Sequence, residues 1–282
     1  MAVENGEWIM RGPDRDDPAC IRSWEALVDW IDQVGFLPLF RNEIEGFSAE
    51  ERTCPFDWWS GDAARDPWEW RQVIARSGRV AYGKFFGKKA GFISRRWFPH
   101  FANWRRDGYD FDSRWDEELA SMRCKRIMDQ FESKDELFSF ELKRLAGFGK
   151  DGEKNFEGTV TDLQMQSYLL IRDFRQRINK KGAPYGWPIS VYTTPEALWG
   201  YDHIASAYST DPMESKAMVY EQVRKNFPEA TQEELDAGQR RMERSWAHIK
   251  QFLLAVLAQD PQVRPGTFHE GFSAEDFVDL LF

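Results

Sequence analysis

Residues 116–192 carry a succession of apolar patterns that only a few folds can accommodate. Apolar side chains at helical spacing predict three helices, at residues 119–131, 140–145 and 156–166. Two short apolar strands are predicted next, at residues 168–171 and 189–192. The segment between these strands is rich in glycine and proline and predicts a turn at 179–186. Three helices followed by a two-stranded ribbon is the element order of a winged helix, a helix-turn-helix variant whose third helix usually enters a groove of DNA.

The rest of the chain adds helical patterns on both sides of this stretch. Ser23 and Gly35 are suited to cap a helix between them, and Asp66-Pro67 is a strong start for a second helix. Two strands are predicted ahead of the winged-helix stretch, at residues 80–82 and 90–93. Two capping boxes predict further helices near the C-terminus, at residues 211–214 and 231–234.

The fold class that follows is α+β, with winged-helix character, a small β element and a mostly helical C-terminal part. We expect four parts along the chain: a loose N-terminus at 1–20, an N-terminal α/β part at 21–115, a winged helix at 116–200, and a helical extension with a tail at 201–282. The N-terminus lacks the pattern of a secretory signal, and no apolar run approaches the roughly 20 residues of a membrane span. We therefore expect a cytoplasmic protein with no membrane partner.

Charge is distributed unevenly in this acidic chain. The formal net charge of its 282 residues is −9, yet residues 70–106 contain ten bases, nine aromatic residues and no acid. Such a segment is suited to an anionic partner, because Lys and Arg neutralise phosphates while aromatic faces stack on exposed nucleic-acid bases. The alternative is a basic face that neutralises acidic residues elsewhere in the fold. The ten bases are Arg71, Arg76, Arg79, Lys84, Lys88, Lys89, Arg95, Arg96, Arg105 and Arg106.

Other polar residues point less strongly to chemistry. The four histidines have no metal-ligand spacing and the three cysteines are far apart in sequence, so we expect neither a metal nor another cofactor. Asp110, Asp112 and Asp116 lie close together in sequence, and neighbouring carboxylates can position a water for glycosidic cleavage. A polar turn with aspartates as helix caps explains the same residues.

The segment Phe86-Gly87-Lys88-Lys89-Ala90-Gly91-Phe92-Ile93-Ser94-Arg95-Arg96-Trp97-Phe98-Pro99 resembles a segment of the AlkZ and YcaQ family of bacterial DNA glycosylases. That family shows Trp-x-His-x-Ala-Ser, two apolar residues and then an aromatic–proline pair. Phe86 stands for the Trp, Lys88 for the His, Ala90 for the Ala, and Phe98-Pro99 for the final pair. The resemblance covers residues 70 to 200 approximately, and it is closest to bacterial proteins described only as AlkZ-related. It implies tandem winged-helix modules around a small β-barrel, and binding of damaged duplex DNA.

The catalytic pair of that family is Gln-apolar-Gln or Gln-apolar-Asp, on a barrel element that should precede Phe86. Residues 1–79 contain no match, whereas Gln164-Met165-Gln166 matches at the end of the third predicted helix. We expect both glutamines on the helix surface. On a helix they point about 200° apart, so they would not converge on one water. We therefore predict that this motif is not the catalytic pair.

These observations favour a DNA-binding winged-helix protein related to AlkZ-type glycosylases, with N-glycosidic hydrolysis of alkylated bases as the enzymatic activity that this relation suggests. Two alternatives stay open, a non-catalytic winged-helix regulator and an acidic interaction protein whose basic strip makes intramolecular contacts. No catalytic residue is assigned from the sequence. We expect duplex DNA to be contacted by Lys84, Lys88, Lys89, Arg95, Arg96, Arg105, Arg106, Thr159, Thr161, Lys180 and Lys181.

The third helix and the turn that follows have assigned roles in this reading. Thr159, Thr161 and Asp162 are expected on the exposed side of the helix, where they could read DNA. The inward side is expected to carry Val160 and Leu163, followed by Tyr168. Lys180 and Lys181 at the turn would then meet the phosphate backbone.

Overall fold

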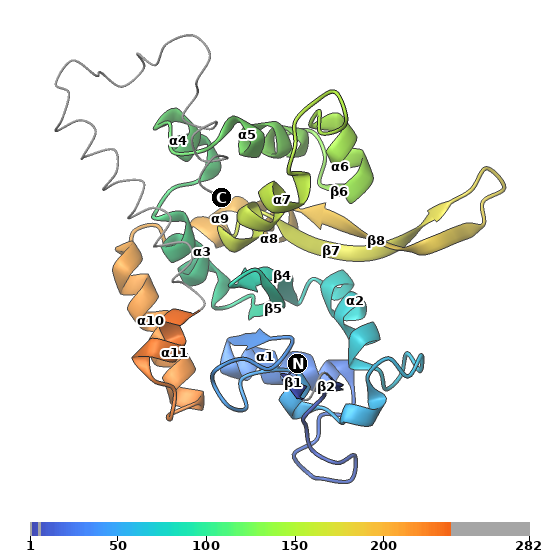
Figure 1. The fold of residues 1–282 in the computed structure, drawn as a ribbon. Coiled ribbons are helices and arrows are strands. Elements are labelled where there is room, and N and C mark those ends of the chain that lie inside the picture. The colour runs from blue at the N-terminus through green and yellow to red at the C-terminus, as the bar shows by residue number, and fades with distance from the viewer. Residues whose placement is uncertain (1, 5–6, 238–282) are drawn as a thin grey trace. The chain divides into compact units, whose positions relative to one another are not determined.

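A computed structural model describes residues 2–4 and 7–237, and Figure 1 shows how these residues are arranged. Met1–Gly238 form one compact unit, and the second unit, Gln239–Phe282, lies outside the described residues. The chain begins with a small hairpin of β1 (Ala2–Glu4) and β2 (Glu7–Ile9). The fold is mixed α/β, with two three-stranded antiparallel sheets surrounded by helices.

The first helices form where the capping residues predict them. Helix α1 (Trp24–Val34) begins after Ser23, whose hydroxyl accepts a hydrogen bond from the Ala26 N–H. Helix α2 (Pro67–Ser77) begins after Asp66, and Gly78 ends it in the left-handed conformation. Two short 3₁₀ helices lie between α1 and α2, at Glu50–Arg52 and Pro55–Asp57.

The first three-stranded sheet is the predicted small β element. Its strand order is β3 (Phe36–Pro38), β5 (Lys89–Ser94) and β4 (Val80–Phe86). Strands β4 and β5 are longer than the sequence predicts because a tight turn joins them, and Phe86 pairs with Lys89. Both turn residues, Gly87 and Lys88, have positive φ, as a type I′ hairpin turn requires.

Short helices follow the first sheet, and the last two of them come after the first strand of the second sheet. These are α3 (Phe98–Arg106), α4 (Phe111–Asp116), α5 (Met122–Met128), a 3₁₀ turn (Asp129–Phe131), α6 (Ser139–Leu145) and α7 (Phe156–Met165). The second sheet has the strand order β6 (Glu136–Phe138), β8 (Pro184–Thr193) and β7 (Leu170–Ile178). The two strands predicted around the glycine-rich turn are therefore paired, and each extends further toward the tip than its apolar pattern suggested.

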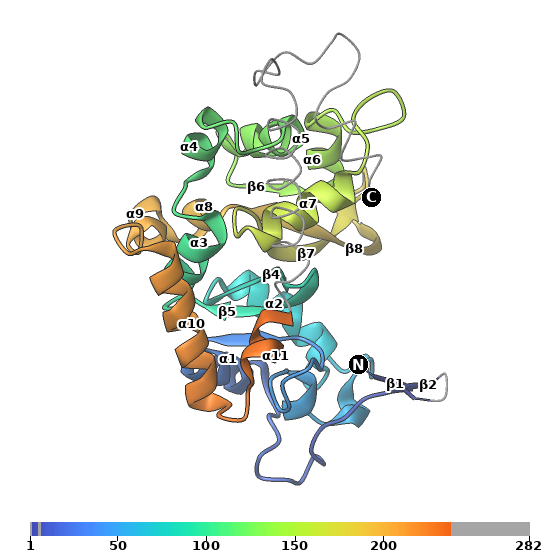
Figure 2. The same ribbon diagram turned by 60° about the vertical axis from the view of Figure 1, so that its left-hand side comes forward.

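The described C-terminal part is helical, as predicted. It contains α8 (Pro195–Trp199), α9 (Tyr201–Ala205), α10 (Pro212–Asn226) and α11 (Gln232–Ala237). Helix α10 packs along α3, which Figure 2 shows from the side. The remainder of the predicted helical extension and tail, 238–282, lies outside the described residues. Among the residues that the structure describes, no helix combines the length and the apolar character needed to cross a bilayer.

Most aromatic residues of the acid-free segment 70–106 belong to the core. Trp70, Phe85, Phe92 and Phe98 are almost completely buried. Tyr82 and Phe101 are buried as well. These rings pack on one another and on neighbouring elements, for example Phe85 on Phe98 with centroids 6.3 Å apart. They stabilise the fold through burial and are not available to stack on nucleic-acid bases.

Arg106, at the end of α3, links this helix to α8 and to the turn before β7. Its side chain is fully buried, and Nη1 donates to Glu196 Oε1 at 2.6 Å and to the Tyr208 hydroxyl at 2.7 Å. Nη2 donates to the Ser167 carbonyl at 2.8 Å, and the guanidinium lies over the Tyr168 ring. Burial opposes the charge, but the Glu196 carboxylate raises the pKa of Arg106 above its ordinary value. Arg106 therefore stays charged while it joins α3, the turn before β7, and α8.

The end of α2 is fixed to β7 and to α8 by similar polar contacts. Arg172 on β7 donates to the Ala75 carbonyl at 2.8 Å, and the Trp199 indole donates to the Gly78 carbonyl at 2.8 Å. Arg76 pairs with the buried Asp173 at 3.0 Å. The contacts of Arg172 and Trp199 satisfy carbonyls that the end of a helix leaves without partners.

Helix α7 is covered on the side that was expected to read DNA. Thr159 and Thr161 are buried, so the prediction that they are exposed is wrong, whereas Asp162 is exposed and Val160 and Leu163 face inward as predicted. The physical reason is that β4 packs against α7. The Lys84 ammonium on β4 lies 3.4 Å from the Thr161 hydroxyl.

Gln164 links α7 to β4, and this corrects its expected place on the helix surface. Its side chain is 1 % exposed, its Oε1 accepts from the Lys84 N–H at 3.1 Å, and its Nε2 donates to the Val160 carbonyl at 3.2 Å. Gln166 caps the same helix and donates to the Asp162 carbonyl at 3.3 Å. Gln164 lies within the helix and Gln166 is its C-cap residue, and the two side chains contact separate partners.

The Gln-Met-Gln motif offers a matched pair of substitutions for stability. Gln164→Ala leaves the Lys84 N–H without its side-chain acceptor, so we expect a loss of about 1–3 kcal/mol in the free energy of unfolding. Gln166→Ala removes a partly exposed side chain and should change that free energy by less than about 0.5 kcal/mol. Urea denaturation of both variants measures the difference. Equal losses would show that the contact of Gln164 with β4 has no special weight.

Candidate nucleic-acid interface

Half of the ten bases in the acid-free segment make side-chain contacts within the protein. Arg76 pairs with Asp173, Arg79 with Asp29 at 3.0 Å, and Arg106 with Glu196. The Arg71 guanidinium lies 3.5 Å from the centroid of the Trp68 ring. Arg105 is buried, and its Nη2 donates to the Phe85 carbonyl. Three of these five therefore neutralise acidic residues elsewhere in the fold, and Arg71 and Arg105 contact a ring and a backbone carbonyl.

Arg105 and Arg106 are consequently not on a DNA-facing surface, which corrects their sequence assignment. They occupy the last turn of α3, and that turn faces the core instead of solvent. The aromatic helix pattern indicated the buried side of α3 but did not show that two adjacent arginines would share it. Such burial requires partners from distant parts of the chain, here the Phe85 carbonyl and Glu196.

A smaller exposed set of cations remains from this segment. Lys89 stands at the tip of the β4–β5 hairpin, and Arg95 and Arg96 lie between β5 and α3. All three are exposed, and no ion pair is found for them within residues 7–237. Lys88 is 45 % exposed and lies 3.8 Å from Asp162, while Lys84 is half-buried against α7.

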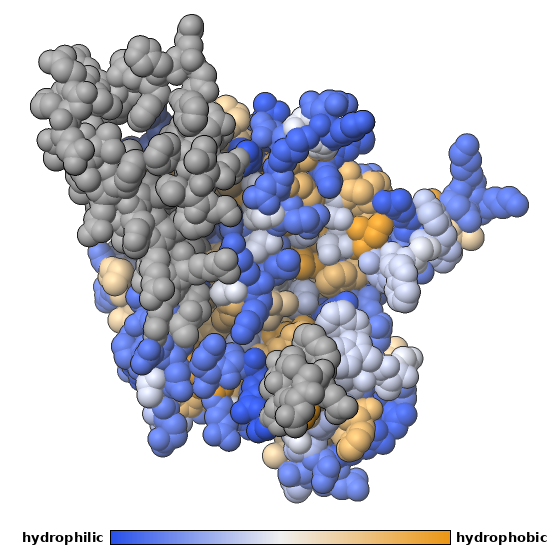
Figure 3. Space-filling view, in the orientation of Figure 1, coloured by the Kyte–Doolittle hydropathy of each residue, from blue (hydrophilic) through white to orange (hydrophobic). Residues whose placement is uncertain are grey.

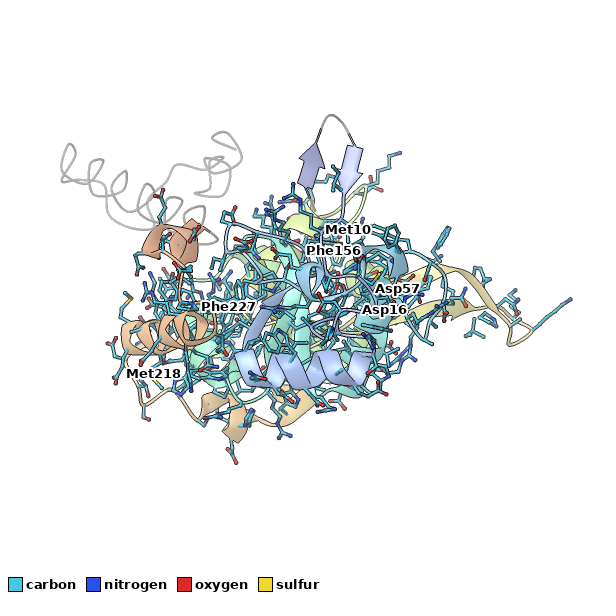
Figure 4. All side chains as sticks on the ribbon, turned by 90° about the horizontal axis from the view of Figure 1, so that it is seen from below. Met10, Asp16, Asp57, Phe156, Met218 and Phe227 are labelled. Atoms are coloured by element: carbon cyan, nitrogen blue, oxygen red, sulfur yellow. The ribbon has the colours of Figure 1, made fainter. Side chains whose placement is uncertain are left out.

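The second candidate surface is the β7–β8 hairpin. In Figure 1 it reaches beyond the neighbouring elements, and Figure 4 shows the same extension from below. Figure 3 shows its tip as a hydrophilic projection. Lys180 and Lys181 are exposed at this tip, as the sequence predicted. The Asn179 side chain accepts from the N–H groups of Lys181 and Ala183 and so shapes the turn.

A second acid-free segment lies later in the sequence. Residues 174–195 contain four bases and no acid. Arg175 pairs with Glu136 and Asp173 near the base of the hairpin, and Arg177 lies over the Phe140 ring at 4.4 Å. The remaining two bases are the tip lysines. The signal that marks residues 70–106, several bases in a stretch without acids, marks this segment as well.

Three apolar side chains on the same hairpin face solvent. Trp187 is 90 % exposed, Ile178 is 62 % exposed and Tyr185 is 47 % exposed. Sequence reasoning missed them because a turn-rich segment was treated as a connection with two lysines. An aromatic residue within an acid-free turn is the pattern that could have found Trp187 and Tyr185.

Asp162 is a carboxylate with an altered environment beside the β4–β5 tip. Its side chain is 51 % exposed and lies 3.8 Å from Lys88 Nζ. Partial burial of the carboxylate raises the pKa of Asp162. The positive charge of Lys88 lowers this pKa, but by a smaller amount. Gln166, which contacts the Asp162 carbonyl, lies on the same helix end.

The three aspartates after Gly108 do not form a convergent carboxylate group. Asp110 caps α4 by accepting from the Ser113 N–H at 2.8 Å, and its other oxygen accepts from the Tyr201 hydroxyl at 3.3 Å. Asp112 and Asp116 lie within α4. Among the described residues, no group of three or more His, Cys, Asp or Glu side chains is placed to hold a metal ion.

Comparison with known proteins supports the resemblance seen in the sequence. The sequence model of the family described as AlkZ related matches residues 21–237. No curated protein and no solved structure matches the chain. The family match spans the helices, both three-stranded sheets and the two candidate surfaces, and it covers well over half of the chain. The chain therefore belongs to the AlkZ-related family.

Proposed function

We propose that this protein binds duplex DNA through the exposed cations of its two hairpins. The observation that carries the proposal is the β7–β8 hairpin, which projects from the fold, contains no acid between residues 174 and 195, and presents Lys180 and Lys181 at its tip. Such a hairpin is suited to follow the phosphate backbone. A relation to AlkZ-type proteins supports DNA as the polyanion.

Residues 116–200 are proposed to form a winged helix. Its wing, the β7–β8 hairpin, would contact DNA more than its third helix, α7, does. Helices α5, α6 and α7 with strands β6, β7 and β8 have the required element order. Because β4 covers α7, its threonines cannot enter a groove. The wing then carries the contact, and further cations stand on the first sheet, with Lys89 at the start of β5 and Arg95 and Arg96 just after its end. A DNA partner would also place the protein in the cytoplasm.

The main test is the salt dependence of binding to an undamaged duplex. If the protein neutralises several phosphates, the logarithm of the affinity falls with the logarithm of salt concentration by about 0.9 per phosphate. Lys180→Ala combined with Lys181→Ala should flatten the slope by about one to two units. Lys88→Ala combined with Lys89→Ala should do the same, because these lysines are also expected to contact phosphates.

Two controls make this test specific. Replacing Lys180 and Lys181 by arginine keeps the charge and should keep the slope. Lys225→Ala removes an exposed lysine on α10, outside both acid-free segments, and should leave the slope unchanged. Absence of binding at low salt, or an unchanged slope in both double variants, contradicts the proposal.

A second candidate function is N-glycosidic hydrolysis of alkylated bases, and the environment of Asp162 favours it. A glycosylase must take the base out of the stack and stabilise a cationic sugar in the transition state. A partly exposed carboxylate with a raised pKa, beside a cation that can hold a phosphate, suits that task. Asp162 would position the attacking water, and Lys88 would hold the adjacent backbone.

The enzymatic proposal is tested by incubating the protein with a duplex that contains alkylated purines and measuring abasic sites. Asp162→Asn should lower the rate by about 100-fold or more, whereas Gln166→Ala should keep at least about a tenth of it. Because the pKa of Asp162 is raised, activity should fall with decreasing pH already above the ordinary aspartate value of about 3.9. No abasic product from the wild type, or equal losses in the two variants, would refute a catalytic Asp162.

A further inference from the structure

Trp187 is the most exposed large apolar side chain among the described residues. Its relative exposure is 90 %, and no ring contact is found for it within residues 7–237. Single exposed apolar residues are common on protein surfaces. Trp187, however, shares its hairpin with exposed Tyr185 and Ile178, in a segment without acids.

The backbone around Trp187 departs from regular strand geometry. The pairing of β7 and β8 shifts between Arg175 and Arg177, and this marks a bulge in β8 that contains Trp187 and lies opposite Gln176. Gly186, immediately before Trp187, has a φ of +74°, and its carbonyl accepts from Gln176 Nε2 at 2.7 Å. Pro188 follows and has no N–H for the strand ladder. Bulges of this kind redirect side chains in functional sheets.

We propose that Trp187 stacks on an unpaired base of DNA, so that the protein prefers DNA in which a base has left the helical stack. This inference rests on the proposed DNA binding and adds the class of substrate. Lys180 and Lys181 hold the phosphates at the tip, and the indole offers an apolar face further along the same hairpin. Every base has a π face, so stacking recognises the exposed base without reading its identity.

Charge argues for a nucleic acid as the occupant of this surface. Lys180 and Lys181 are exposed at the hairpin tip, and residues 174–195 around them contain no acid. An acidic protein could satisfy the lysines, but the proposal requires a planar partner for the indole as well. DNA supplies both groups once a base is unstacked.

The test compares two duplexes of the same length and sequence, one fully paired and one with a single extra unpaired nucleotide. Affinities are measured by fluorescence anisotropy of a labelled strand at one fixed salt concentration. The wild type should bind the bulged duplex about 5- to 100-fold more tightly, the range expected from stacking of one base on an aromatic side chain. Trp187→Ala should lose that preference while its affinity for the paired duplex stays within about twofold, because the phosphate contacts remain.

Two further variants serve as controls. Trp187→Phe keeps an aromatic face and should keep most of the preference. Phe56→Ala removes another highly exposed aromatic residue, 81 % exposed and outside both acid-free segments, and should change neither affinity. Thermal unfolding of each variant confirms that the fold is intact.

The outcomes separate this inference from the proposal beneath it. No binding to either duplex contradicts DNA binding as a whole. Equal binding of the two duplexes by the wild type, or a preference that survives Trp187→Ala, leaves DNA binding in place and overturns the stacking role. The stacking role is supported if Trp187→Ala loses the preference for the bulged duplex and the two control variants keep it.

Discussion

The arrangement of this fold depends on the contacts that the buried guanidinium of Arg106 makes. It joins the end of α3 to α8 through Glu196 and to the turn before β7 through the Ser167 carbonyl. Breaking a buried ion pair by removing one partner typically costs about 3–5 kcal/mol, because the other charge stays buried without compensation. Since β7 begins directly after that turn, Arg106 also anchors the chain where it enters β7.

The elements defined by local rules could be predicted from the sequence. Ser23, Asp66 and Gly78 act as caps, and the apolar strands around the glycine-rich turn pair as expected. The burial of Arg106 could not be predicted, because its partner Glu196 lies 90 residues away in the sequence. Thr159 and Thr161 were misplaced for a related reason: helical periodicity shows which side of α7 is apolar, but not that β4 covers the polar side.

The candidate surface shows the same division between local and distant information. Counting charges located a basic segment, yet the fold uses Arg76, Arg79 and Arg106 in ion pairs with residues outside it. The lysines at the two hairpin tips were found correctly as exposed residues because tight turns have few neighbours that could cover them. What remains is a pair of exposed cationic hairpin tips, and an acidic protein with such tips is suited to bind a polyanion locally despite its net charge of −9.

Lysine footprinting measures most directly whether the hairpin tips are the DNA-binding surface. The protein is treated with an amine-acylating reagent with and without a saturating duplex, and mass spectrometry compares the modification of each lysine. The account predicts that DNA protects Lys89, Lys180 and Lys181, while exposed Lys225 on α10 reacts equally in both samples. Binding of the duplex with unchanged reactivity at the tips, or with protection at Lys225 instead, would contradict it.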